Sequence, residues 1–147
     1  MQPAAVAPDT ASAEDALVRL MMAIGRRFRA RIDGDTVDPS QAALLYALSC
    51  HGAMRLGDLA ETMKLDASTV SRHVQQLGDH GFIRRDPDPA DGRASIIDLS
   101  DAGRDALRLT FDQRRAFLTA ALADWSEADR HRLHADIVRL TAGLADI

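Results

Sequence analysis

The chain has 147 residues, of which 46% are apolar and 27% are charged, a composition typical of a folded globular protein and not of a disordered one. Its single cysteine excludes an intramolecular disulfide framework, and no apolar run reaches the roughly 18–20 residues that a membrane helix needs. The formal net charge of −4 would disfavour nucleic acid as a partner if the charge were spread evenly over the surface. Affinity for nucleic acid depends on the charge of the face that contacts it, so the net charge does not exclude DNA binding.

The first residues carry no recognisable targeting signal. Residues 1–13 lack both the basic start and the apolar stretch of a secretory signal peptide. Together with the lone cysteine, this favours a cytoplasmic protein with no membrane partner. The length fits a single domain, 1–147, that buries a core of its own.

An amphipathic helix is predicted over residues 13–32. Its apolar residues recur with the helical period and form one stripe, made of Leu17, Leu20, Met21, Ile24 and Phe28. Ser12 and Asp15 have the spacing of a capping box, which predicts where this helix begins.

Three further helices are predicted before the middle of the chain ends. Asp38 and Pro39 suit the N-cap and first positions of the second helix, and Gly52 ends it. A short third helix is expected over residues 56–63. A fourth is expected over residues 67–80.

Two short strands, 82–85 and 95–99, are predicted to follow. The segment between them, 86–93, contains two prolines and a glycine, which forbid a helix and favour a hairpin loop. Ser100 then suits the cap of a fifth helix that reaches about residue 123.

A sixth helix closes the chain, with Ser126 and Asp129 in capping positions. Its apolar stripe consists of Leu133, Ile137, Leu140 and Leu144. One protomer of this size does not easily cover the stripes of the first, fifth and sixth helices, so a homodimer that interlocks these helices is expected.

This order of elements predicts a mainly α fold with a small β-hairpin wing. Residues 53–99 form the winged helix-turn-helix, the DNA-binding region. Residues 12–36 and 100–147 supply the helices of a dimerisation layer.

The fourth predicted helix separates apolar from polar residues. Its buried side carries Val70, Val74 and Leu77. The rest of its surface carries hydroxyls, amides and an arginine, namely Ser68, Thr69, Ser71, Arg72, Gln75 and Gln76. These groups recognise base edges and phosphates in the major groove of DNA, whereas a merely solvated face more often carries Glu and Lys. We therefore predict that this face contacts DNA.

The hairpin supplies further candidate contacts. Arg93 lies in the predicted loop and suits the narrow minor groove, and Asp91, two residues before it, is placed to hold its guanidinium. Arg55 opens the third helix and Arg84 lies at the base of the hairpin, so both are also predicted to contact DNA. The alternative for Arg93 is a surface salt bridge with Asp91, which contributes little by itself.

A series of short motifs runs through this region in a fixed order. They are Asp-Leu-Ala (58–60), Ser-Thr-Val-Ser-Arg (68–72), Leu-x-x-x-Gly-Phe-Ile-x-Arg (77–85), Asp-Gly-Arg (91–93) and Leu-Ser-x-x-Gly (99–103). The combination resembles the MarR family of bacterial winged helix-turn-helix transcription regulators. The match is close over residues 55–103, whereas the flanking helices match only in length and pattern.

The resemblance implies a homodimer on a pseudo-palindromic operator of double-stranded DNA, with recognition helices in successive major grooves and wings in the minor groove. By position, it assigns DNA contacts to Ser68, Thr69, Ser71, Arg72, Gln76 and Arg93, with Asp91 supporting Arg93. It also implies a repressor that releases DNA on binding a small aromatic or lipophilic effector, or on cysteine oxidation, without indicating which signal applies here.

Several other residues have two interpretations. Cys50 is interpreted as a buried structural cysteine and not as a redox sensor, because the family's peroxide sensors place their reactive cysteine nearer the first helix. His131 and His134 are interpreted as an exposed pair, since no further metal ligands are evident. Phe28 and Tyr46 are expected in the core or dimer interface, with an effector pocket as the alternative.

Rival functions have weaker support. The sequence has no Walker loop, nucleophile elbow, zinc-protease signature or paired-cysteine site, so we expect no enzyme activity, no cofactor and no metal. A winged helix used for protein contact would present apolar or acidic residues on the exposed face of the fourth helix. The choice between repressor and activator stays open at this stage.

Overall fold

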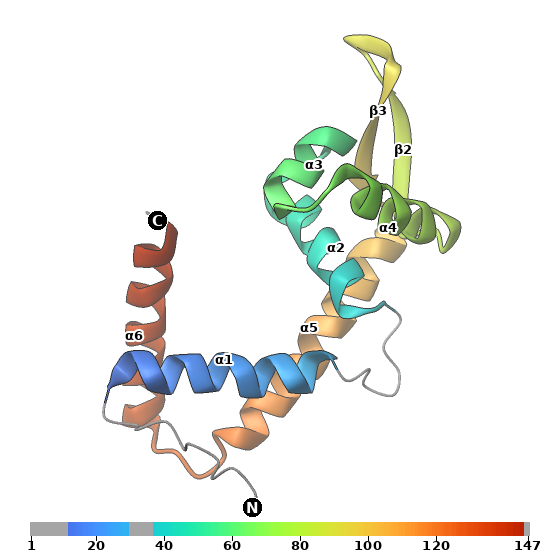
Figure 1. Ribbon diagram of the computed structural model, residues 1–147. Coiled ribbons are helices and arrows are strands. Elements are labelled where there is room, and N and C mark those ends of the chain that lie inside the picture. Colours follow the sequence, from blue (N-terminus) through green and yellow to red (C-terminus); the bar gives the residue numbers. More distant parts are fainter. Residues whose placement is uncertain (1–11, 30–36, 146–147) are drawn as a thin grey trace, which may run out of the picture. The chain divides into compact units, whose positions relative to one another are not determined.

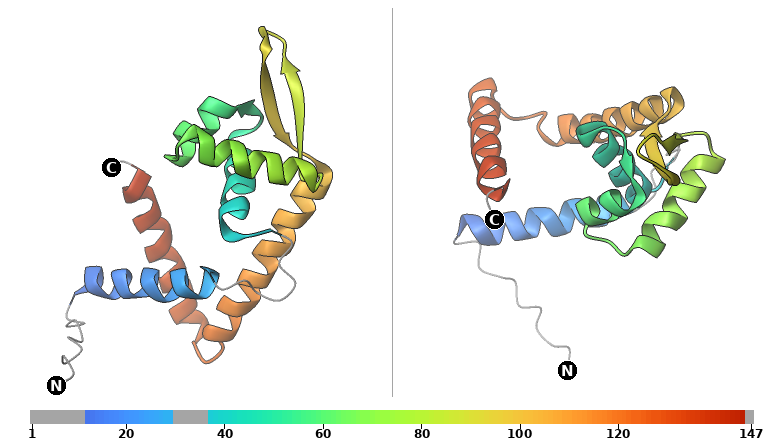
Figure 2. Two further views of the ribbon diagram at one scale, coloured as in Figure 1. Left: turned by 45° about the vertical axis from the view of Figure 1, so that its right-hand side comes forward. Right: turned by 90° about the horizontal axis from the view of Figure 1, so that it is seen from above.

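The computed structural model describes residues 12–29 and 37–145 (Figures 1 and 2). The chain divides into two compact units, Met1–Leu107 and Arg108–Ile147. The elements are α1 (Ala13–Arg29), α2 (Pro39–His51), β1 (Met54–Arg55), α3 (Leu56–Met63), α4 (Ala67–Asp79), β2 (Ile83–Asp88), β3 (Asp91–Leu99), α5 (Asp101–Ala121) and α6 (Glu127–Ala145). This mainly helical fold with one small antiparallel sheet confirms the predicted fold class.

The core of the first unit lies where α2, α3 and α4 pack on the sheet. The side chains with less than 2% exposure come from all of these elements and from the residue two positions before α2: Val37, Leu44, Leu45, Leu48, Leu59, Val70, Val74, Leu77, Ile97 and Leu99. Burial of each such aliphatic side chain stabilises the fold by about 1.5–3 kcal/mol. The predicted buried side of the fourth helix is therefore confirmed, and α4 presents its opposite side to solvent.

Helix α2 is closed at both ends by the residues that the sequence indicates. The Asp38 carboxylate accepts the N–H groups of Ser40 and Gln41 at 2.8 and 2.9 Å, and Gln41 Oε1 accepts the N–H of Asp38 at 3.1 Å. This reciprocal pair is a capping box. Gly52 ends the helix with a φ of 79°, a conformation that favours glycine.

The wing is longer than predicted. Strands β2 and β3 pair from Ile83 with Leu99 to Asp88 with Asp91, so most of the segment expected to be loop is strand. The strand order β1-β3-β2 places β2 at an edge, where the missing N–H of Pro87 breaks no ladder, and a register shift follows at Asp88. The predicted long loop was therefore wrong, and Figure 2 shows the hairpin extending beyond α3 and α4.

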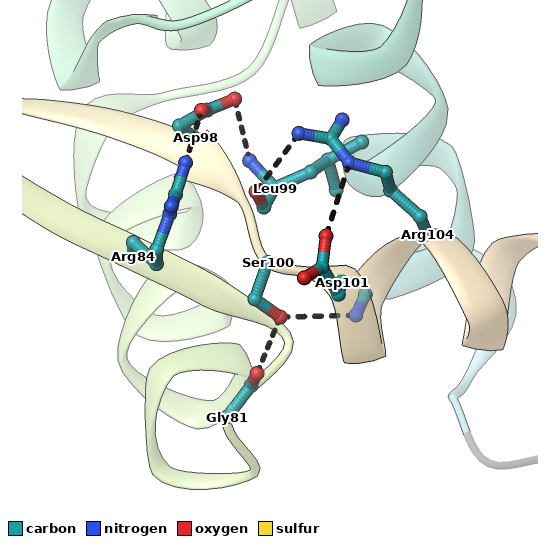
Figure 3. Close-up of polar contacts among 8 residues, drawn as sticks. Gly81, Arg84, Asp98, Leu99, Ser100, Asp101 and Arg104 are labelled. Carbon is teal, nitrogen blue, oxygen red and sulfur yellow. Dashed lines mark hydrogen bonds and ion pairs between the residues drawn. The ribbon is translucent and has the colours of Figure 1, made fainter.

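The first turn of α5 is fastened to the end of α4. Ser100 Oγ accepts the N–H of Gly103 at 3.0 Å and donates to the carbonyl of Gly81 at 2.5 Å (Figure 3). The N–H of Ser100 donates to the carbonyl of Phe82 at 3.1 Å. Ser100 therefore caps α5, as predicted, and also ties it to the turn that precedes the wing.

Helices α1 and α6 begin at their predicted caps. The Ser12 hydroxyl accepts the N–H of Asp15 at 3.1 Å, and the Ser126 hydroxyl accepts the N–H of Asp129 at the same distance. α1 is described to Arg29, and the rest of the predicted helix, 30–32, lies outside the described residues. No helix among the described residues combines the length and apolar character needed to cross a bilayer.

Candidate nucleic-acid interface

The turn between α3 and α4 sets the start of the candidate recognition helix. Lys64 ends α3 in the left-handed conformation, with a φ of 52°, and Asp66 is the N-cap of α4. The Asp66 carboxylate accepts the N–H and the hydroxyl of Thr69, at 2.8 and 2.7 Å, and the hydroxyl of Ser68. These hydrogen bonds hold the pKa of Asp66 well below its usual range, and the one from Ser68 has the largest effect.

This capping network changes what Ser68 and Thr69 offer to a partner. Both hydroxyls donate their protons to Asp66, so their outward-facing groups are acceptor lone pairs. A phosphate needs a donor. Contact of these two hydroxyls with a phosphate therefore requires them to leave Asp66.

The exposed side of α4 presents the polar residues that the sequence predicts. Ser71, Arg72, Gln75 and Gln76 are all exposed. The guanidinium of Arg72 forms no hydrogen bond or ion pair with any residue in the ranges 12–29 and 37–145. Arg72 thus keeps its full donor capacity for an external partner.

The two glutamines of α4 are held by neighbouring elements. Gln75 Nε2 donates to Asp79 at 3.0 Å, and Gln75 Oε1 accepts from Arg85 of β2 at 3.5 Å. Gln76 Oε1 accepts from Gln41 Nε2 of α2 at 3.3 Å. The amide of Gln75 is therefore engaged at both ends, whereas that of Gln76 is engaged only at its oxygen among the described contacts.

Arg93 is the third residue of β3, near the tip of the wing, and is exposed. Asp91 accepts the backbone N–H of Arg93 at 3.1 Å. The expected ion pair between the Asp91 carboxylate and the guanidinium is not found within the described residues. Asp91 instead shapes the main chain at the tip, because two residues of separation let its carboxylate reach the backbone N–H.

Arg55 and Arg84, both predicted to contact DNA, have acidic partners in the wing. Arg55 pairs with Asp88, which is only 7% exposed, and Arg84 pairs with Asp98 at 2.9 Å (Figure 3). Asp88 also accepts the N–H of Ala90 at 2.8 Å. This hydrogen bond has the largest lowering effect on the pKa of Asp88, and the hydrogen bond and charge of Arg55 lower it further. The arginines therefore brace the hairpin against α3 and across its own strands.

Comparison with known proteins identifies this arrangement. A sequence profile of the MarR family matches residues 37–95. An HTH-type transcriptional regulator from Mycobacterium bovis is 31% identical over 124 residues, which cover 84% of this chain and 83% of that protein. The chain belongs to the MarR family. It is accordingly a winged helix-turn-helix transcription regulator, and DNA binding follows from the family.

Solved structures show the same fold as this MarR-family chain. A MarR family protein from Bacillus stearothermophilus has a TM-score of 0.79 at 20% identity and covers 90% of this chain and 92% of its own. A probable transcriptional regulator from Pseudomonas aeruginosa has a TM-score of 0.62 at 29% identity, covering 88% and 99%. The family and the relatives named here are transcription regulators, not enzymes.

A small cavity lies beside α4 on its wing side. Its volume is about 170 Å³, and its lining comes from α3, α4 and the sheet: Leu56, Ser71, Val74, Arg85, Ser95 and Ile97. Ser71, a predicted DNA contact, therefore borders both the exposed side of α4 and this cavity. Arg85 ends the motif at residues 77–85 but was not among the predicted DNA contacts, because its proximity to α4 arises only when the hairpin folds back.

The predictions for the remaining candidate residues of the MarR-family chain can be compared with their exposure in the structure. Cys50 is exposed, so its interpretation as a buried cysteine was wrong; it lies half a helical circumference from the buried Leu48. Tyr46 is 52% exposed, and a hydrogen bond with the Cys50 thiol raises the pKa of Tyr46. The side chain of Phe28 lies outside the described residues, and His131 and His134 are exposed.

Proposed function

We propose that the protein is a homodimeric repressor that binds a pseudo-palindromic operator with α4 in the major groove and the wing in the minor groove. The observation that carries this proposal is Arg72, whose guanidinium is exposed at the centre of the polar side of α4 and has no partner among the described residues. An arginine in this setting matches the O6 and N7 acceptors of guanine. Ser71 and Gln76 flank it on the same side.

The wing supports the minor-groove part of the proposal. Arg93 stands near the tip of a hairpin that Arg55 and Arg84 brace through ion pairs. A cation on a rigid hairpin suits the narrow minor groove, where the electrostatic potential is most negative. In this role Asp91 shapes the tip, and Arg55 and Arg84 position the wing unless they exchange their carboxylates for phosphates.

Exposed apolar side chains support the homodimer. They recur on the helices that flank the winged region and include Val18, Leu20, Met21, Leu109, Phe111, Leu118, Ile137, Val138, Leu140 and Leu144. Surfaces of this kind on a monomer mark a contact with another molecule. A two-fold dimer would use residues 12–36 and 100–147 and place the two α4 helices one DNA turn apart, roughly 34 Å.

The proposed regulation follows the family resemblance. A small aromatic or lipophilic effector would favour a dimer whose two α4 helices no longer match successive grooves, a population shift between two arrangements. Tyr46, exposed on α2, is the described candidate for its binding, and Phe28 is the second. Repression is the consequence of operator occupancy.

The first experiment is selection of bound sequences from a random duplex library, followed by affinity measurements over a range of salt. A palindromic motif and a fall in log K with log salt, with a slope of about −0.9 for each phosphate contacted, are expected. Light scattering of the free protein should give twice the mass of the chain. Sequence-independent binding, or a monomer on a single half-site, would contradict the proposal.

Arg93→Ala should weaken binding to all duplexes by a similar factor and reduce the salt slope by about 1, because the wing would lose one cation among the phosphates. Arg139→Ala is the matched control, since Arg139 is 87% exposed on α6 and its loss changes the net charge equally. The check is a salt titration of both variants on the selected operator. An unchanged slope for Arg93→Ala would remove the wing from the DNA contacts.

A further inference from the structure

The side chain of Gln41 connects the start of α2 to the exposed side of α4. Its Oε1 accepts the backbone N–H of Asp38 at 3.1 Å, and its Nε2 donates to Oε1 of Gln76 at 3.3 Å. The sequence analysis does not single out Gln41. Its importance depends on a contact between residues 35 positions apart in the chain.

The backbone determines the orientation of both amides. A main-chain N–H can only donate, so the atom of Gln41 that faces Asp38 must be the oxygen. The nitrogen of Gln41 then faces Gln76 and donates, so the atom of Gln76 in this contact must be its oxygen. The NH₂ group is therefore the end of the Gln76 side chain that stays open to a partner.

We infer that Gln41 is a positioning residue for sequence recognition, one that turns the Gln76 amide so that its NH₂ group meets the base edge. This inference rests on the proposed function. A glutamine without such a neighbour can rotate its amide by half a turn and present either a donor or an acceptor. Such a side chain tolerates any base, whereas an oriented one discriminates between them.

The oriented amide selects a chemical class of base. In the major groove, guanine O6 and N7, adenine N7 and thymine O4 are acceptors, whereas adenine N6 and cytosine N4 are donors. A donor at Gln76 therefore favours guanine or thymine over cytosine, which offers only a donor, and adenine, which offers one acceptor and one donor, lies between them. Gln75, the adjacent glutamine, is already engaged at its nitrogen by Asp79 and at its oxygen by Arg85.

The test starts from the operator selected with the full-length wild-type protein. Comparison with the motif selected by Gln76→Ala identifies the base that Gln76 meets. Dissociation constants are then measured on operators that carry each of the four bases at this position. We expect the wild type to prefer guanine or thymine over cytosine by about tenfold, the size of one base-edge contact.

Two substitutions of Gln41 have opposite expected effects on this preference. Gln41→Ala leaves the Gln76 amide free to rotate, so the preference should fall below about twofold, a small fraction of a base-edge contact. Gln41→Glu keeps an acceptor for the N–H of Asp38, as in a standard capping box, but offers only acceptors to Gln76. The Gln76 amide must then turn its NH₂ inward, and the preference should reverse toward cytosine.

The controls separate this role from a structural one. The added charge of Gln41→Glu weakens binding to all sequences alike, so only the ratio between bases is compared. The preference at the base pair met by Arg72 should stay unchanged in both variants, and Arg139→Ala, the exposed control on α6, should leave the preference at the Gln76 position intact.

Three results would overturn the inference. The first is a Gln76→Ala motif identical to that of the wild type. The second is an unchanged base ratio in both Gln41 variants; in either case operator binding, and with it the proposed function, would stand. The third is failure of the wild type to select any motif, which would remove the proposed function and this inference together.

Discussion

Gly103→Ala is expected to destabilise the protein by about 3 kcal/mol, the upper end of the usual range for an overpacked site. A Cβ atom at position 103 would lie 1.9 Å from the carbonyl oxygen of Phe82 and 2.9 Å from its carbonyl carbon. These are backbone atoms, which cannot move aside as the end of a flexible side chain can. The same carbonyl accepts the N–H of Ser100, so moving it also weakens the start of α5.

Urea unfolding followed by circular dichroism measures this effect. Gly57→Ala is the matched control, because Gly57 lies in α3 and a Cβ there meets nothing within 4 Å. Alanine is the better helix former by about 0.5–1 kcal/mol, so the control should be neutral or more stable than the wild type. Equal stability of Gly103→Ala and the wild type would show that α5 does not approach Phe82 this closely.

Arg72→Ala is expected to lower affinity for the operator by about 1–3 kcal/mol and to relax base preference at the pair that Arg72 meets. Arg72 has no protein partner within the described ranges, so its removal leaves no other group unsatisfied in the free protein. The loss should therefore come from the complex, and the unfolding midpoint should hardly change. Competition binding with operators altered at single base pairs measures it.

Arg115→Ala provides the comparison of equal charge. Arg115 is 74% exposed on α5 and pairs only with Asp112 at 3.3 Å among the described ion pairs. Its loss should leave base preference unchanged. If Arg72→Ala also kept the wild-type preference at every position of the operator, Arg72 would be a phosphate contact or a bystander, and the major-groove assignment would need another residue.

The helix boundaries could be predicted because their signals are local. Asp38 and Gly52 bound α2, and Ser100 and Ser126 cap α5 and α6, each through groups within four residues of the helix end. Such signals depend on hydrogen bonds along the chain and need no tertiary contact. The length of the wing strands could not be predicted in this way. Strand β2 can include Pro87 only because β2 lies at the edge of the sheet, which is a tertiary feature.

The polar side of α4 could also be predicted, since helical periodicity separates it from Val70, Val74 and Leu77. The hydrogen-bond partners of the side chains on this side could not be predicted. Ser68 and Thr69 donate to Asp66, and the amide of Gln75 is occupied by Asp79 and by Arg85 of the wing. These contacts leave Arg72, the Ser71 hydroxyl and the NH₂ group of Gln76 as the open donors of the predicted set on α4 among the described residues.

The sequence by itself determined the order of the helices, their caps, the buried side of α4 and the family. Hydrophobic periodicity, capping residues and motif spacing depend only on residues that are close together in the chain. The tertiary structure alone decided which charged and polar groups are engaged by partners far along the chain. Arg55 meets Asp88, and Gln41 meets Gln76, across 33 and 35 positions of the chain. No local pattern encodes such pairs, since they exist only after the packing of the core sets helix and hairpin side by side.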